Sequence, residues 1–82
     1  MFDIIATPAY SRNFEKLPSQ VQREIERGVE LLRLNPHHPS LRTHKRRGAT
    51  DVWQARITRS YRLYFHMEAD IITLLGVGPH EK

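Results

Sequence analysis

The sequence predicts an α+β fold in which two helices pack on one face of a mostly antiparallel four-stranded sheet, in the order β-α-α-β-β-β. Three observations support this prediction. A short β-type run opens the chain, two segments with helical periodicity follow, and three strand-like runs fill the last third. Because the chain has 82 residues and contains no internal repeat or low-complexity linker, we expect a single domain spanning residues 1–82.

The first strand and the first helix lie close together at the N-terminus. Residues 2–6 form a short run of the β type. Thr7 and Pro8 are typical of an N-cap and the first turn of a helix, and this helix is expected to continue to about residue 16. This arrangement joins a strand directly to a short helix.

A longer amphipathic helix follows Pro18. We expect Ser19 to cap it, and Asn35-Pro36 to end it. One face carries charge, and the other carries an apolar stripe formed by Val21, Ile25, Val29 and Leu32. Gly28 lowers the helix propensity by about 1 kcal/mol relative to Ala, which suggests a close packing contact at this position.

A β-hairpin is predicted after a loop over residues 37–50. Polar and apolar residues alternate over residues 53–57, and again over residues 61–66, with a tight connection between them. Since strand side chains alternate between the two faces, Arg56 and Arg62 can share the outward face across the hairpin. The helices leave this face of the sheet free.

The last strand is predicted over residues 71–77, which are almost wholly apolar. Such a run is typical of a central strand that is buried on both sides. Gly78-Pro79-His80 follows at once, so His80 stands where the chain leaves the sheet. Loops after strand ends are positions where a rigid scaffold presents reactive groups.

The positive charge is concentrated in one quarter of the chain. Residues 41–62 hold seven Lys and Arg residues against one acidic residue, whereas the rest of the chain holds six basic and eight acidic residues. This distribution favours a polyanionic partner such as a nucleic acid, and a plain solvated basic loop is the alternative.

Several classes of protein are excluded by the composition. The sequence has no cysteine, no run of about 20 apolar residues and no signal-peptide pattern at its N-terminus, so we expect a cytoplasmic protein without a membrane span. No Gly-rich phosphate loop or nucleophile elbow is present. The five histidines lack the spacing of a metal site, and we expect neither metal nor cofactor.

Arg56, Arg62 and His80 are the candidate catalytic residues. Arginine binds phosphate through a planar fork, and histidine transfers protons near neutral pH. RNA supplies its own nucleophile, the 2′-hydroxyl, if the phosphate is held in line. His80 would then protonate the leaving 5′-oxygen as the general acid. The general base stays open, with His66 and Glu81 as candidates.

RNA contacts outside the catalytic set are expected from a second group of residues. Basic side chains bind phosphates without reading sequence, and an outward-facing tyrosine can stack on a base. This group consists of Lys45, Arg46, Arg47, Arg59 and Tyr64.

Three strings together resemble the RelE/ParE superfamily of toxin-antitoxin toxins. They are VWQARI at 52–57, YRLYF at 61–65 and LGVGPH at 75–80. The resemblance covers nearly the whole chain and implies a compact toxin with a small antitoxin as its partner in a hetero-oligomer. RelE-like members cut messenger RNA in the ribosomal A site. By position, Arg62 corresponds to the strand arginine that contacts the scissile phosphate and His80 to the proton donor.

The resemblance also leaves some roles and functions open. Stacking by a C-terminal aromatic residue, common in the superfamily, would here fall to Tyr64 or Tyr61. A ribosome-dependent endoribonuclease that inhibits translation is the leading hypothesis. The alternatives are a ParE-like inhibitor of DNA gyrase without chemistry of its own, and an inactive toxin fold that binds an antitoxin or acts as a co-repressor.

Overall fold

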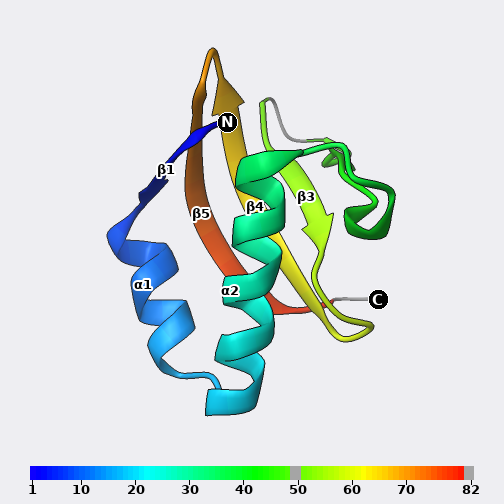
Figure 1. Ribbon diagram of the computed structural model, residues 1–82. Coiled ribbons are helices and arrows are strands. Elements are labelled where there is room, and N and C mark those ends of the chain that lie inside the picture. The colour runs from blue at the N-terminus through cyan, green and yellow to red at the C-terminus, as the bar shows by residue number, and fades with distance from the viewer. Residues whose placement is uncertain (49–50, 81–82) are drawn as a thin grey trace.

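The computed structural model describes residues 1–48 and 51–80, which form two helices and a five-stranded sheet (Figure 1). The elements are β1 (Asp3–Ala6), α1 (Pro8–Glu15), α2 (Ser19–Leu34), β2 (His44–Lys45), β3 (Trp53–Arg56), β4 (Tyr61–Glu68) and β5 (Ile71–Pro79), with a short 3-10 helix at Pro39–Leu41. The strand order is β1-β5-β4-β3-β2, and only the β1–β5 pair is parallel. The predicted α+β class and the mostly antiparallel sheet are confirmed.

The sheet has one strand more than the sequence predicts. β2 lies inside the segment that we expected to be a loop, and it pairs with β3 through His44 opposite Gln54 and Lys45 opposite Trp53. Two residues are too few to show a periodic pattern, so the strand depends on its partner and not on its own sequence. Residues 49 and 50 of the predicted loop lie outside the described part of the chain.

Both helices begin close to their predicted positions. The Thr7 hydroxyl accepts a hydrogen bond from the Tyr10 N–H and donates one to the Leu74 carbonyl, so it caps α1 and ties it to β5. The prediction of Ser19 as a cap is wrong, because Pro18 is the N-cap of α2 and no side chain caps this helix. Neither helix in the described ranges is long and apolar enough to cross a membrane.

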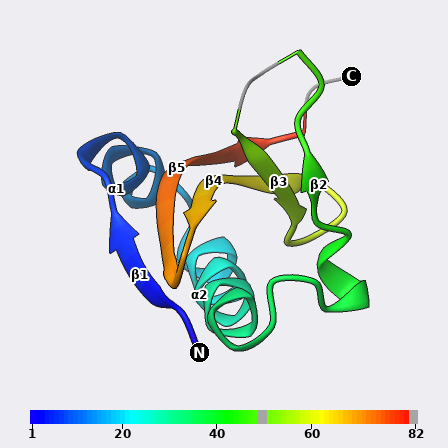
Figure 2. The ribbon, with the colours of Figure 1, turned by 90° about the horizontal axis from the view of Figure 1, so that it is seen from above.

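The core lies between α2 and the sheet, whose strands curve around this helix (Figure 2). Its fully buried large side chains are Ile25, Leu32, Leu63, Phe65 and Ile72. The close contact predicted at Gly28 is confirmed, because a Cβ atom there would collide with Cδ1 of Ile57. Glycine therefore lets α2 approach the end of β3.

β5 is an interior strand between β1 and β4, but the prediction that it is buried on both sides is wrong. Ile72, Leu74 and Val77 point into the core, whereas Ile71 is 42% exposed. The helices cover only one face, so alternate residues of β5 face outward. A register shift between Tyr64 and Phe65 divides the β4–β5 ladder into two parts.

α1 continues along the edge of β5 where β1 ends. The side-chain oxygen Oδ1 of Asn13 accepts a hydrogen bond of 3.2 Å from the Val77 N–H. A side chain thus replaces the missing strand partner at this backbone group. The helices thus lie on one face and at the edge of the sheet. The other face carries no helix, and we call it the open face.

Candidate active site on the open face of the sheet

A pocket of about 290 Å³ lies on the open face, at the end of the sheet where β5 leaves it. Its walls are Arg42, His44, Gln54, Arg56, Arg62 and His80. The three candidate catalytic residues from the sequence, Arg56, Arg62 and His80, are therefore together in one place. Arg42 and His44 are additions that the sequence reasoning missed.

The register of three strands places the two arginines. Arg56 of β3 pairs with Arg62 of β4, and Arg62 pairs in turn with Gly78 of β5. Cross-strand partners share a face, so both arginine side chains leave their strands on the open side. A Cβ atom at Gly78 would meet nothing within 4 Å, which leaves open space beside Arg62 for a ligand.

Arg62 is held by the turn that joins β3 to β4. Its Nη1 lies within hydrogen-bonding distance of three backbone carbonyls, those of Thr58 at 2.8 Å, Arg59 at 3.3 Å and Tyr61 at 3.2 Å, which share its two N–H groups. Since guanidinium carries five N–H donors, Nε and Nη2 keep donors for a phosphate. The turn thereby fixes the orientation of the fork before any ligand binds.

The same turn holds His80. The backbone N–H of His80 donates to the Ser60 carbonyl at 2.7 Å, and this bond fastens the chain beyond β5 to the β3–β4 connection. A residue that looks like part of a loose tail in the sequence is thus anchored beside Arg62. This anchor is a backbone N–H group, so the direction of the imidazole depends on the side-chain torsions of His80.

His44 contributes a second imidazole with a defined tautomer. Its Nδ1 lies 2.9 Å from the backbone carbonyl of Arg42. A carbonyl can only accept, so Nδ1 is the donor, and Nε2 of the neutral ring is then an acceptor. Arg42 adopts a left-handed conformation with φ 48° and ψ 42°, which turns its carbonyl toward the ring. The sequence carries little signal for His44, because this residue faces the pocket only when β2 pairs with β3 and His44 lies opposite Gln54.

The predicted RNA-contacting residues are divided by the structure. The guanidinium carbon of Arg46 lies 4.8 Å from the centre of the Tyr64 ring, on the open face. Lys45 instead lies over Trp53, at 5.5 Å from its ring centre, on the other face of β2 from His44. Arg47 and Arg59 are exposed and do not line the pocket.

Of the two candidates for a general base from the sequence, His66 does not line this pocket. His66 lines a separate hollow at the opposite end of the open face, with Ile5, Ile71 and Thr73 among its walls. Glu81 lies outside the described residues. Within the pocket, His44 is the residue whose Nε2 can accept a proton.

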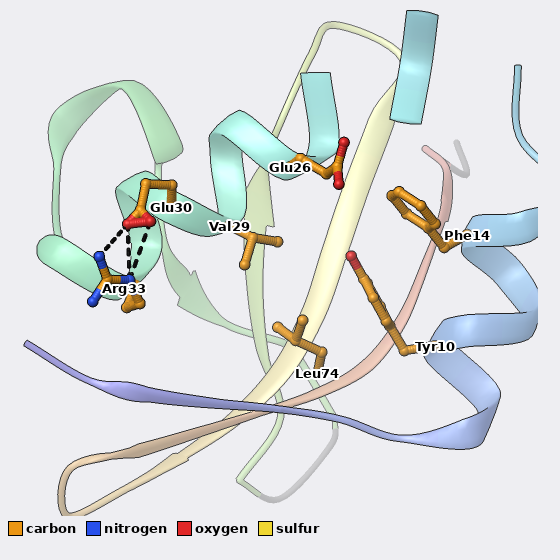
Figure 3. Close-up of a pocket in the computed structure, with 7 residues that line it drawn as sticks. All are labelled: Tyr10, Phe14, Glu26, Val29, Glu30, Arg33 and Leu74. Carbon is orange, nitrogen blue, oxygen red and sulfur yellow. Dashed lines mark hydrogen bonds and ion pairs between the residues drawn. The ribbon is translucent and has the colours of Figure 1, made fainter. Parts of the chain in front are cut away.

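Another hollow, of about 370 Å³, lies between the helices, where α1 and α2 diverge over β5 (Figure 3). Its lining residues are Tyr10, Phe14, Glu26, Val29, Glu30, Arg33 and Leu74. Burial, with a smaller effect from Glu26, raises the pKa of Tyr10 to about 12. Hydrogen bonding to Arg33 lowers the pKa of the Glu30 carboxyl. This groove is apolar at its base and charged at its rim.

The open-face pocket can therefore bind an anion and move protons. Three arginines supply positive charge, and two imidazoles supply an acceptor and a proton donor. In residues 1–48 and 51–80 no three His, Cys, Asp or Glu side chains gather as metal ligands would. A phosphodiester is the anion that suits both the forks and the proton-transfer groups.

Solved structures define the class of fold. The archaeal RelE-RelB complex from Pyrococcus horikoshii OT3 matches with a TM-score of 0.79 and 18% identity, over 95% of this chain and 93% of that chain. The isolated E. coli RelE toxin matches with a TM-score of 0.79 and 19% identity, over 100% and 87%. The YoeB/ParE toxin from Agrobacterium tumefaciens gives 0.80 and 14%, over 99% and 100%. At these identities the likeness shows the fold, which is that of RelE/ParE toxins.

The sequence identifies the family. Residues 3–82 match the family described as ParE toxin of type II toxin-antitoxin system, parDE. The chain belongs to this family and is a toxin of the RelE/ParE superfamily, which confirms the resemblance found in its sequence. No curated protein sequence matches it.

Proposed function

We propose that the protein is an endoribonuclease that cuts messenger RNA in the ribosomal A site and so inhibits translation. One observation carries this proposal: the open-face pocket brings Arg56, Arg62, His44 and His80 together around a space that is free beside Gly78. An inhibitor that acts by binding alone has no need for two imidazoles beside two arginines. A ribosomal site of action places the protein in the cytoplasm.

The proposed reaction is an attack by the 2′-hydroxyl on the adjacent phosphorus. Nε2 of His44 takes the hydroxyl proton, and the new O–P bond forms as the bond to the 5′-oxygen breaks. His80 gives a proton to that leaving oxygen. The products are a 2′,3′-cyclic phosphate and a 5′-hydroxyl, so atoms and charges balance without a co-reactant.

The arginines stabilise the charge that grows on the phosphoryl oxygens. Nε and Nη2 of Arg62 remain as donors, and Arg56 stands directly across the hairpin. Donors that are fixed before the reaction lower the barrier, and removing one such donor typically costs 10²- to 10³-fold in rate. The three turn carbonyls around Nη1 are the source of this preorganisation.

The test is primer extension on messages after brief induction of the wild type and of His80→Gln without antitoxin. We expect new 5′ ends inside translated codons for the wild type and a loss of about 10²- to 10⁴-fold for the variant. His66→Gln is the matched control, because it changes a histidine on the same face at the far end of the sheet. Full cutting by His80→Gln would remove this residue from the mechanism.

A second variant tests the base. His44→Gln keeps a polar side chain but removes the proton acceptor that Nε2 provides, so we expect a loss in single-turnover cutting of about 10²-fold or more. An unchanged single-turnover rate would assign the base elsewhere.

Inhibition of DNA gyrase is the second candidate function, and the family match to parDE toxins favours it. In this case induction should produce gyrase-linked DNA breaks while messages stay intact. Growth without arrest would instead indicate an inactive toxin fold that serves as a binding partner or co-repressor. The primer-extension experiment, with growth followed alongside, separates all three outcomes.

We further propose that a cognate antitoxin protein binds this toxin in a hetero-oligomer. Chains in the RelE-RelB complex from Pyrococcus horikoshii OT3 and in the E. coli RelBE complex share the fold. The groove between α1 and α2 offers Phe14, Val29 and Leu74 to an apolar partner segment. Val29→Glu places a charge among them, so we expect it to weaken rescue of growth by the antitoxin while toxicity persists. Equal rescue would place the antitoxin on another surface.

A further inference from the structure

The proposed general base lies on β2, a strand of two residues at the edge of the sheet (Figure 2). Nδ1 of His44 donates to the carbonyl of Arg42, which belongs to the same segment of chain. This bond fixes the ring relative to that segment, and not relative to Arg62 and His80 across the pocket. The position of the base therefore depends on how firmly β2 is held against β3.

The backbone alone gives β2 a short ladder. Two residue pairs join it to β3, and the N–H of Arg46 donates to the Val52 carbonyl at 2.7 Å just beyond them. A backbone hydrogen bond adds only modestly to stability in water, because the unpaired groups bond to water instead. So short an edge strand opens easily unless side chains strengthen its pairing.

A cation–π contact on the helix side of the sheet joins β2 to β3. Nζ of Lys45 lies 5.5 Å from the centre of the Trp53 ring, within the range of about 6 Å over which such contacts are attractive. The two residues are cross-strand partners, so the contact acts directly on the pairing. Trp53 packs against the core, and the His37 ring meets it edge-on at 6.0 Å between ring centres. The indole is thus a fixed surface for the ammonium group.

Side chains alternate along β2, so Lys45 and His44 lie on opposite faces of the sheet. We propose that Lys45 and Trp53 are positioning residues, which hold β2 against β3 and thereby keep Nε2 of His44 in the open-face pocket. This inference rests on the proposed ribonuclease function. It gives Lys45 a role in placing the base, instead of the RNA contact expected from the sequence.

The first measurement is hydrogen exchange of the Arg46 amide in the full-length protein, because pairing of β2 protects this N–H. Lys45→Met keeps an unbranched side chain on an exposed residue but removes its charge. We expect exchange about threefold faster, as the loss of an exposed cation–π contact predicts. Lys45→Arg should restore the wild-type rate. Lys16→Met removes the same charge from an exposed residue at the end of α1, so it should leave this exchange unchanged.

The second measurement is single-turnover cutting of messenger RNA on programmed ribosomes, at rising toxin concentration. At saturation Lys45→Met should cut about threefold more slowly and Trp53→Leu about tenfold, whereas Trp53→Phe keeps a ring and should recover most of the rate. Loss of an RNA contact would instead raise the toxin concentration needed and leave the rate at saturation unchanged. In a His44→Gln background neither substitution should slow cutting further, since the base that they position is already absent.

Distinct results overturn distinct claims. Unchanged exchange of the Arg46 amide in Lys45→Met would show that the contact does not hold β2. An equal further loss of rate in the His44→Gln background would show that Lys45 and Trp53 do not act through the base. In both cases the ribonuclease proposal stands as long as the wild type cuts messages. A wild type that leaves messages intact would refute that proposal and the catalytic part of this one, and the exchange rates alone would then decide whether Lys45 holds β2.

Discussion

The two ends of the open sheet face differ in chemistry, although β4 and β5 run through both. At one end the pocket walls are arginines, histidines and Gln54. At the other end Ile5, Ile71 and Thr73 surround His66, and Ile5 and Ile71 are exposed. The register shift between Tyr64 and Phe65 lies between the two ends. A single pair of strands thus carries two unrelated surfaces.

This difference shows what a site on a sheet needs beyond suitable residue types. His66 and His80 are both on or beside the long strands, but only His80 is close to arginines and fastened by the turn at Ser60. Charge, free space and backbone anchoring coincide at one end only. Comparable substitutions at the two ends of the open face therefore test the proposed site directly.

The largest effect is expected at Arg62. Arg62→Ala removes the guanidinium fork that the turn fixes. We expect single-turnover cutting of messenger RNA on programmed ribosomes to fall about 10³-fold. Arg62→Lys keeps the charge but not the planar geometry, so it should recover only part of the rate. A lysine variant with the full wild-type rate would show that charge alone matters at this position.

A smaller effect is expected from filling the space beside Arg62. Gly78→Val places a side chain over the pocket, where a Cβ atom meets nothing within 4 Å, so cutting should fall about tenfold or more while the thermal midpoint changes little. Thr73→Val puts the same side chain at the apolar end of β5 and should leave cutting unchanged. Similar losses in both variants would indicate a general effect on β5 and not a blocked pocket.

A separate effect is expected on stability in alkali and involves neither end of the open face. The folded protein holds the Tyr10 phenol proton with a pKa of about 12, compared with 10.0 for the unperturbed group. Its contribution to the free energy of unfolding is therefore complete below pH 10 and is lost as the pH rises toward 12, by up to about 2 kcal/mol. Chemical denaturation across this range should show a smaller decline for Tyr10→Phe. Parallel declines would place the alkaline transition at other groups.

Much of the fold could be predicted because its elements carry local signals. The stripe on α2 and the alternation on β3 and β4 fix which side chains face the core, and these place Arg56 opposite Arg62. The same alternation sends Tyr64 outward. Pocket residues on regular strands were therefore accessible to sequence reasoning.

The remaining part of the site depends on contacts that have no local pattern. β2 is two residues long, and His44 faces the pocket only because it pairs with Gln54. The tautomer of His44 follows from the left-handed backbone at Arg42, a conformation that is uncommon for residues other than glycine. The error at Ser19 has a related cause, since Pro18 already holds the N-cap position of α2.

The parallel pairing of β1 with β5 has a consequence for how the toxin is made. Asp3 pairs with Ile71 and Ala6 with Leu74, so the first strand has no neighbour in the sheet until the last one has been synthesised. Contacts between such distant residues form late and slow folding. Arg62 and His80 also meet only when β5 is in place beside β4. A chain that still lacks β5 can therefore complete neither the five-stranded sheet nor the cationic pocket, so this pocket is absent from any folding intermediate in which β5 is unpaired.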